Sequence, residues 1–205
     1  MSIHPLRIDI CQAVPAALPV PAPSDEALIA RIATGDKLAM RALFARHHLR
    51  IYRFALRLVR EREAAEDIIS EVFLEVWRHA ATFGERAKVS TWLLAIARFK
   101  GLSRLRRRGE APLDEHTAAA LVDPDNDPEL AIRKQERSDI LRRCLARLSP
   151  AHREIVDLVY YQDLAISQVA EVVGIPENTV KTRMFHARKQ LSGLLAAAGI
   201  ERSLP

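Results

Sequence analysis

The sequence predicts an all-α protein made of two small helical domains joined by an acidic, flexible linker. Ala, Leu, Arg and Glu dominate the 205 residues, and glycine is scarce. These abundant residues lose little rotamer freedom in a helix. Apolar residues recur at three- and four-residue steps over long stretches, and strand-like alternation is absent from the sequence pattern. Hydrophobic residues make up 49% of the chain, which is enough to build packed cores.

Residues 1–23 are predicted to form a disordered N-terminal extension. Its apolar residues are interrupted by Pro5, Pro15, Pro19, Pro21 and Pro23. A signal peptide would need a basic start and an unbroken apolar stretch. No apolar run approaches the ~20 residues that cross a bilayer. We therefore expect a cytoplasmic protein without membrane insertion.

The first helical domain is predicted over residues 24–108. Ser24 precedes two acids, Asp25 and Glu26, which is typical of a helix start. Helical spacing then persists to Arg108, with short breaks near Gly35 and around residues 82–85. The apolar positions of its first long stretch are Leu38, Leu43, Phe44, Ile51, Phe54, Ala55 and Leu58.

Residues 109–137 are predicted to be the linker. They contain three prolines, and their acids outnumber their bases, a composition that favours an unpacked segment. The second domain is assigned to residues 138–205, within a helical block that begins near Asp127 and runs to Ala198.

A helix-turn-helix pattern lies between Ser167 and Leu191. We expect Ser167 to cap a short helix with an apolar inner face, and Gly174 to end that helix in a left-handed conformation. Pro176 can begin the next helix, where its missing N–H costs nothing. Such a tight turn between a short and a longer helix is the arrangement that places a recognition helix in DNA.

At 100° per residue, the second helix of this motif has a core-facing side and a polar side. Val180, Met184, Ala187 and Leu191 share the core-facing side. The amide, hydroxyl, imidazole and cationic groups opposite suit base edges and phosphates in a major groove, whereas an ordinary surface helix is the alternative. The predicted DNA contacts, for which the family resemblance given below implies the minus-thirty-five promoter element, are Asn178, Thr179, Lys181, Thr182, Arg183, His186, Arg188 and Lys189.

The first domain carries two strongly charged stretches. Residues 65–77 form an amphipathic helix with Asp67, Glu71 and Glu75 on one acidic track, and residues 86–108 contain eight bases and no acid. Bases this dense are expected to hold phosphates and to make binding salt-dependent. An apolar stripe runs through the basic stretch, which therefore reads as a folded helix.

The segments 148–161 (LSPAHREIVDLVYY) and 169–188 (VAEVVGIPENTVKTRMFHAR) closely resemble region four of the sigma-seventy family, in particular its extracytoplasmic-function (ECF) group. The segment 88–98 (KVSTWLLAIAR), with Leu105 to Arg108 after it, is similar to region two of the same family. The resemblance covers roughly 25–108 and 138–198 in the family's order and spacing.

This resemblance implies an RNA polymerase sigma factor that directs promoter recognition, DNA melting and transcription initiation. Its partners would be core RNA polymerase, promoter DNA (a duplex minus-thirty-five and a melted minus-ten element) and an anti-sigma factor wedged between the domains. The residues implied to bind core polymerase are Asp67, Ser70, Glu71, Phe73 and Leu74. The residues implied to hold the minus-ten strand are Phe83, Arg86, Lys88, Ser90, Thr91, Arg98, Lys100, Arg104, Arg106 and Arg107.

Several positions depart from the family's common residues. Ser70 stands where Gln is frequent, Phe99 and Ser103 replace Asn and Asp of the basic helix, and His186 replaces a frequent Arg. The two tryptophans, Trp77 and Trp92, lie on apolar stripes and are predicted to be core residues.

Other classes of function fit the sequence less well. No nucleophile–base pair or phosphate loop is visible, and His47 and His48 are consecutive on a helix and cannot face one point, so we expect no enzyme. Two cysteines, Cys11 and Cys144, form no metal-type pair, so no metal and no cofactor are expected. A helix-turn-helix regulator would not need the acid-free basic helix, and a decoy that only sequesters an anti-sigma factor would not need DNA contacts.

Overall fold

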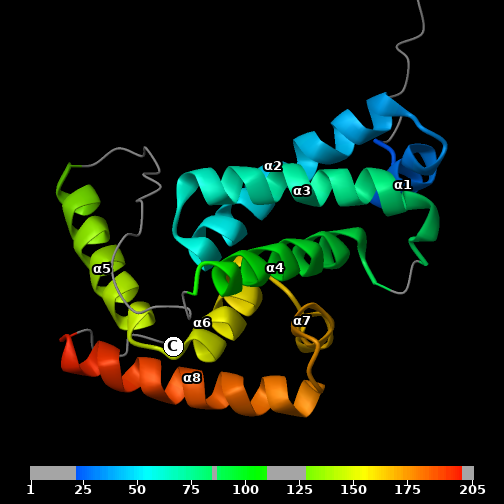
Figure 1. Cartoon of the computed structure of the whole chain (residues 1–205). Helices are drawn as coiled ribbons and strands as arrows, with labels where there is room; N and C mark the ends of the chain where they lie inside the picture. The colour runs from blue at the N-terminus through cyan, green and yellow to red at the C-terminus, as the bar shows by residue number, and fades with distance from the viewer. Residues whose placement is uncertain (1–21, 85–86, 110–127, 200–205) are drawn as a thin grey trace, which may run out of the picture.

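The computed structural model describes residues 22–84, 87–109 and 128–199 (Figure 1), with side chains of the fifth helix described from residue 136 onward. The predicted extension up to residue 21, Cys11, Arg86 and the linker segment 110–127 lie outside the described residues. Within them every regular element is helical, which confirms the predicted all-α class. The elements are α1 (Asp25–Ala33), α2 (Lys37–Val59), α3 (Arg62–His79), η1 (Ala80–Thr82), α4 (Val89–Arg107), α5 (Pro128–Ala146), α6 (Pro150–Val156), η2 (Asp157–Tyr161), α7 (Ile166–Val173) and α8 (Glu177–Ala197).

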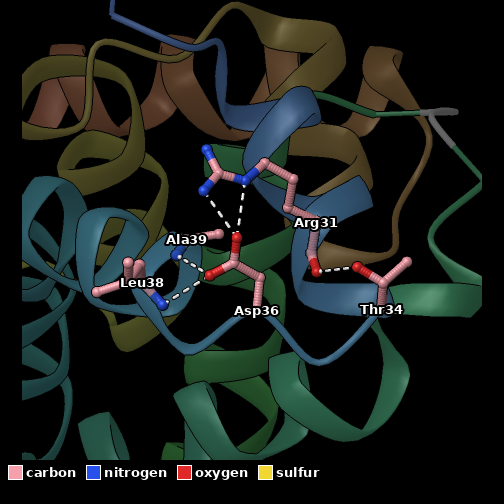
Figure 2. A network of polar contacts seen from close by, with 5 residues as sticks. All are labelled: Arg31, Thr34, Asp36, Leu38 and Ala39. Atoms are coloured by element: carbon pink, nitrogen blue, oxygen red, sulfur yellow. Dashed lines mark hydrogen bonds and ion pairs between the residues drawn. The ribbon is translucent and has the colours of Figure 1, made fainter.

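The turn between α1 and α2 falls at the predicted break (Figure 2). Gly35 has a φ of 86°, which a residue with a Cβ rarely adopts. Asp36 then caps α2, because its Oδ1 accepts from the backbone N–H groups of Leu38 at 2.8 Å and Ala39 at 3.1 Å. Its other oxygen accepts both Nε and Nη2 of Arg31, at 2.9 and 2.7 Å. One carboxylate thus joins the two helices.

A break between α2 and α3 was not predicted. Arg60 has a φ of 57° and its backbone N–H donates to Leu56 O at 2.8 Å, which ends α2 in a left-handed turn. Neither glycine nor proline marks this turn, so the apolar spacing on either side read as one continuous helix.

Helices α2, α3 and α4 pack on one another to form the core of the first domain. Leu43, Ile68 and Leu93, one from each helix, are at most 1% exposed. Gly101 allows α4 to approach α2, since a Cβ at this position would lie 2.5 Å from the Cδ2 of Leu58.

Two apolar residues of the predicted periodic set lie outside this core. Leu38 is 68% exposed and Phe44 is 42% exposed. Apolar spacing therefore identified the helix, but it did not distinguish residues packed inside from those on the surface.

Helices α6 to α8, with the π-helical turn η2, form the helix-turn-helix of the second domain. Gly174 ends α7 in a left-handed conformation with a φ of 74°, as predicted. Ser167 is not the cap of α7, because the helix already begins at Ile166. There the Ala165 N–H donates to the side-chain oxygen of Gln168 at 3.0 Å instead.

Helix α5 begins at Pro128, so residues 128–137, assigned to the linker from the sequence, are helical. A proline at the first helical position needs no hydrogen-bond partner for its nitrogen. Farther along α5, the side chain of Cys144 is buried.

The two domains pack against each other. Helix α4 lies between the α2–α3 layer and the helices of the second domain, and it contacts α7 directly (Figure 1). None of the helices in the described ranges has the length and hydropathy of a membrane span.

Candidate nucleic-acid interface

Helix α8 presents the predicted recognition residues outward. Val180 and Ala187 are fully buried and Met184 is 4% exposed, which confirms the predicted core-facing side. Among the predicted DNA contacts, Thr179 and Arg183 are half-buried on the flanks. The remaining ones are exposed, namely Asn178, Lys181, Thr182, His186, Arg188 and Lys189. This side of α8 is therefore a polar and cationic surface open to a partner.

Phe185 also belongs to this outward side of α8 and was missed from the sequence. Its side chain is 64% exposed and its ring lies 5.5 Å from that of His186, edge to face. The signal was available, because 100° per residue places Phe185 between Lys181 and Lys189 on the helix surface. Phe185 was assigned neither to the core-facing side nor to the polar side of the helix.

The acidic track of α3 faces the basic helix α4. Asp67 pairs with Arg104 at 2.6 Å, and Lys100 lies 2.8 Å from Glu75 and 3.4 Å from Glu71. The hydrogen bond with Glu75 raises the pKa of Lys100 and, in turn, lowers the pKa of Glu75, so both groups are held charged. From the sequence, the acids of α3 were expected to bind polymerase and the bases of α4 to bind DNA. In the structure these charges neutralise one another within the first domain.

The residues expected to bind core polymerase divide into a buried and an exposed set. Phe73 is 5% exposed and packs against the ring of Phe44 at 4.8 Å, so it does not reach the surface. Ser70 and Leu74 are exposed. Trp77 shares their face of α3 and is 37% exposed, so the prediction that it is a core residue is wrong. Together Ser70, Leu74 and Trp77 form a surface that we call the α3 face.

An open hollow of about 990 Å³ lies beside the end of η1 and the first turns of α4. Phe83 and Trp92 line it, with ring centroids 4.9 Å apart. Trp92 is half-buried against the core as well as lining the hollow. Thr82 and Lys100 supply polar groups to the same hollow. Aromatic walls with a hydroxyl nearby suit an unstacked base, whereas the charge of Lys100 is already neutralised by Glu75 and Glu71.

Phe99 lies at the rim of this hollow and of a second one. It is 62% exposed, and the second hollow, of about 760 Å³, runs between α4 and α7. The sequence singled Phe99 out only as a departure from the family's Asn. Phe99 is therefore an exposed aromatic side chain beside both hollows.

Two of the predicted minus-ten residues on α4 contact the second domain. Thr91 is 1% exposed, and its hydroxyl oxygen accepts from the side-chain amide of Gln168 at 3.3 Å. Arg98 donates to both carboxylate oxygens of Glu154, at 2.7 and 3.2 Å. By contrast, Lys88, Arg106 and Arg107 are exposed, and Ser90 is half-buried.

A second set of contacts joins α2 to the π-helical turn. Arg57 Nε lies 2.5 Å from Asp157 Oδ1, an ion pair without the angles of a hydrogen bond. Burial raises the pKa of Asp157 to about 6, although Arg57 opposes that shift. Arg50 donates through Nε to the side-chain oxygen of Gln162 at 3.0 Å and through Nη2 to its backbone carbonyl.

Comparison with known proteins matches both domains. Residues 43–110 match the family described as Sigma-70 region 2, and residues 138–191 match Sigma-70, region 4. The ECF RNA polymerase sigma factor SigK of Mycobacterium bovis is 30% identical over 174 residues, covering 83% of this chain and 92% of SigK. This chain belongs to the ECF sigma factors. Membership of the ECF sigma factors makes it a DNA-binding protein of transcription initiation.

A further ECF sigma factor and two solved structures are also similar to this chain. The sigma factor SigL of Mycobacterium tuberculosis is 29% identical over 177 residues, covering 86% of this chain and 99% of SigL. The fold is shared with CnrH, solved with the cytosolic domain of CnrY (TM-score 0.60, 23% identity, covering 84% of this chain and 97% of CnrH). It is also shared with the sigma factor RpoE of Bartonella quintana, solved with the anti-sigma factor NepR (TM-score 0.61, 21% identity, covering 76% and 96%).

Proposed function

We propose that this ECF sigma factor binds core RNA polymerase, recognises duplex minus-thirty-five DNA through α8 and holds the melted minus-ten strand on α4. The observation that carries the proposal is the pairing of two nucleic-acid surfaces in one chain. One is the outward side of α8, and the other is the basic α4 beside an aromatic hollow. A helix-turn-helix regulator needs only the first of these surfaces.

The proposed minus-thirty-five surface has groups of three kinds. Lys181 and Lys189 suit phosphates, Asn178 suits an adenine edge, and Phe185 suits a thymine methyl group. They lie on one exposed side of a single rigid helix. This arrangement supports reading of a major groove by α8.

The proposed minus-ten surface suits an unpaired strand better than a duplex. Phe83, Trp92 and Phe99 offer ring faces or edges around the hollow. Stacking on aromatic side chains is available only to bases that have left the duplex. Arg106 and Arg107, at the end of α4, are exposed cations that suit the backbone of the same strand.

Core polymerase is proposed to bind the α3 face. Leu74 and Trp77 place apolar surface there, and Ser70 adds a hydroxyl. Exposed apolar surface surrounded by polar groups is typical of protein interfaces. The polymerase supplies the chemistry, so the sigma factor itself is proposed to catalyse no reaction and to work in the cytoplasm, where the polymerase is.

We also propose control by an anti-sigma factor. CnrH and the Bartonella RpoE, which share this fold, were solved with CnrY and with the anti-sigma factor NepR, respectively. A partner wedged between the two domains would cover the side of α4 that contacts α7.

Reconstitution with bacterial core RNA polymerase tests the proposal. Transcripts from a pool of the host's upstream DNA are sequenced with and without the protein. Start sites that depend on the protein are expected, and their upstream sequences give both promoter elements. If the polymerase neither bound the protein nor changed its start sites, the proposal would fail. DNA binding without polymerase would then indicate an ordinary regulator, and absence of DNA binding a decoy.

A further inference from the structure

We infer that Tyr160 is a positioning residue for DNA binding, because its ring holds the Arg188 guanidinium in place for a phosphate of duplex DNA beside α8. The inference rests on the proposed function and deepens it, since it adds a residue of the π-helical turn η2 to the minus-thirty-five surface. The partner is the DNA backbone, and a backbone contact fixes the register of a recognition helix without reading the bases.

The guanidinium of Arg188 lies over the ring of Tyr160. Its central carbon is 5.6 Å from the ring centroid, within the distance at which an aromatic face attracts a cation. A ring holds a guanidinium through its face and accepts none of its N–H groups. These groups can therefore still donate in pairs to the oxygens of a phosphate.

Arg188 also keeps its positive charge available for a phosphate. Within the described part of the chain, it forms no ion pair with a carboxylate. By contrast, Arg98, Lys100 and Arg104 of the first domain are each paired with an acid. A neutral ring orients a cation without cancelling its charge, and this distinguishes Tyr160 from an acidic neighbour.

The position of Arg188 on α8 suits a contact with the DNA backbone. Arg188 is exposed and follows Lys181 by seven residues, about two helical turns, so the two cations lie along one edge of the outward side. The exposed Phe185 lies between them along this edge. Cations spaced along the edge of a recognition helix suit the phosphates of one DNA strand.

The π-helical turn carries Tyr160 to this edge of α8. Helix α6 continues into η2, where the Gln162 N–H donates to the Asp157 carbonyl, five residues earlier, at 3.1 Å. Leu158 is fully buried on the inner side of the turn, and its carbonyl accepts from the Leu164 N–H at 3.1 Å. Single π-helical turns are rare and frequent at functional sites. The exposed Tyr160 ring therefore stands on a turn whose inner side is fixed in the core.

The neighbouring Tyr161 has the same side chain but holds a different arginine. Its ring lies under Arg57 of α2, with 4.9 Å between the guanidinium carbon and the ring centroid. The two tyrosines are exposed to a similar degree, 58% for Tyr160 and 51% for Tyr161. Tyr160 thus holds an arginine of the recognition helix and Tyr161 an arginine of the first domain, which makes Tyr161 a matched control.

The ring lowers the cost of the phosphate contact. A free arginine side chain loses rotamer freedom when a partner fixes it. A side chain that already rests on a ring has less of this freedom to lose, so pre-positioning strengthens binding without adding a contact to the DNA. Exposed cation–π contacts are weak, so the expected effect on affinity is a few-fold.

The experiment measures binding of a fluorescein-labelled duplex by the full chain assembled with core RNA polymerase, by anisotropy at fixed salt. The duplex carries the region upstream of a start site found by the reconstitution. Tyr160→Leu removes the ring, keeps an apolar side chain and should bind about threefold more weakly. Tyr160→Phe keeps the ring face and should bind as the parent does. The control Tyr161→Leu should also leave the affinity unchanged.

A double variant separates positioning from a merely structural role. Arg188→Ala should weaken binding and lower the slope of log affinity against log salt by about one, as for one lost phosphate contact. Adding Tyr160→Leu to Arg188→Ala should cause no further loss, because the group that the ring positions is gone. A tyrosine that only supported the fold would instead weaken binding by the same factor with and without Arg188.

Four results would each overturn the inference. Tyr160→Leu could bind as the parent does, Tyr160→Phe could bind as weakly as Tyr160→Leu, or the loss could be the same with and without Arg188. An equal loss in Tyr161→Leu would be the fourth, because the turn as a whole would then be responsible.

The outcome is separable from that of the proposed function. If the protein directs polymerase to specific start sites and one of these four results is found, only the role of Tyr160 is wrong. If no start site depends on the protein, the proposed function is wrong, and the role of Tyr160 falls with it.

Discussion

Arg57 Nε of α2 lies 2.5 Å from Asp157 Oδ1 of the π-helical turn, so an ion pair joins the two domains. Arg57 also lies over the ring of Tyr161, 4.9 Å from its centroid. At the Asp157 carboxyl, burial affects the pKa more than Arg57 does, and it raises the pKa from 3.8 to about 6. The pair therefore orients the domains while the charge itself is unfavourable at neutral pH.

The raised pKa of Asp157 predicts a pH-dependent stability. The folded protein holds this proton more tightly than the unfolded chain, so the contribution is complete below about pH 4 and is lost as the pH rises through about 6. Asp157→Asn stays neutral throughout. Its free energy of unfolding, relative to the parent, should be higher at pH 7.5 than at pH 4.5, as measured by urea denaturation.

The control for this measurement is Asp139→Asn, at a more exposed carboxylate paired with Arg142 on α5. It should show no such increase between the two pH values. If the difference in free energy of unfolding between Asp157→Asn and the parent stayed constant with pH, that result would contradict the raised pKa of Asp157.

Phe99→Ala should weaken binding of single-stranded minus-ten DNA while leaving duplex minus-thirty-five binding unchanged. Loss of one stacked base corresponds to about 1–3 kcal/mol. Phe185→Ala should do the reverse, since that ring lies on the outward side of α8. Fluorescence anisotropy with the two DNA forms, once the promoter is known, separates the two roles. Equal losses on both DNAs would contradict the assignment of each ring to one element.

Lys181→Ala should reduce minus-thirty-five affinity and flatten its dependence on salt. Each phosphate contact that is lost lowers the slope of log affinity against log salt by about one. The matched control is Lys37→Ala, which removes the same charge from an exposed site on the first domain. Titration of the duplex at several salt concentrations measures both quantities. An unchanged slope for Lys181→Ala would exclude a phosphate contact there.

Gly101→Ala and Gly193→Ala should have opposite effects on stability. Replacing a helical glycine with alanine favours the helix by about 1 kcal/mol. At Gly193 nothing lies within 4 Å of the new Cβ, so this gain should appear in full. At Gly101 the methyl would meet Leu58, which offsets the gain and should give a net loss of about 1 kcal/mol.

Thermal unfolding of the two glycine variants provides the comparison. A rise in Tm for both would mean that Leu58 moves aside without cost, and the close approach of α4 to α2 would then not depend on glycine.

Several features of the fold could be predicted from local sequence alone. Gly35 and Gly174 mark turns that need left-handed backbone, and the apolar spacing of α8 identified its buried side. The break at Arg60 could not be predicted in this way, because nothing in its residue type distinguishes it from a helical position. Ser167 was assigned as a cap by its chemistry, but the helix starts at the residue before it.

The candidate site could likewise be predicted only in part from the sequence. The outward side of α8 follows from a period of 3.6 residues, and exposure confirmed it for most of its members. Phe99, Trp77 and Phe185 have apolar side chains on the surface, which residue type alone assigns to the core. Whether an apolar residue is covered depends on which neighbour packs over it, and that neighbour can be distant in the chain.

The sequence by itself determined the all-α class, the two-domain organisation and the family, because periodicity, turn residues and motif spacing are local or ordered along the chain. Only the tertiary structure decided which charges meet. Lys100 faces Glu75, and Arg98 faces Glu154, 56 positions away in the sequence. Coulomb attraction acts through space, so a base expected to hold phosphate can instead pair with a carboxylate brought beside it by packing.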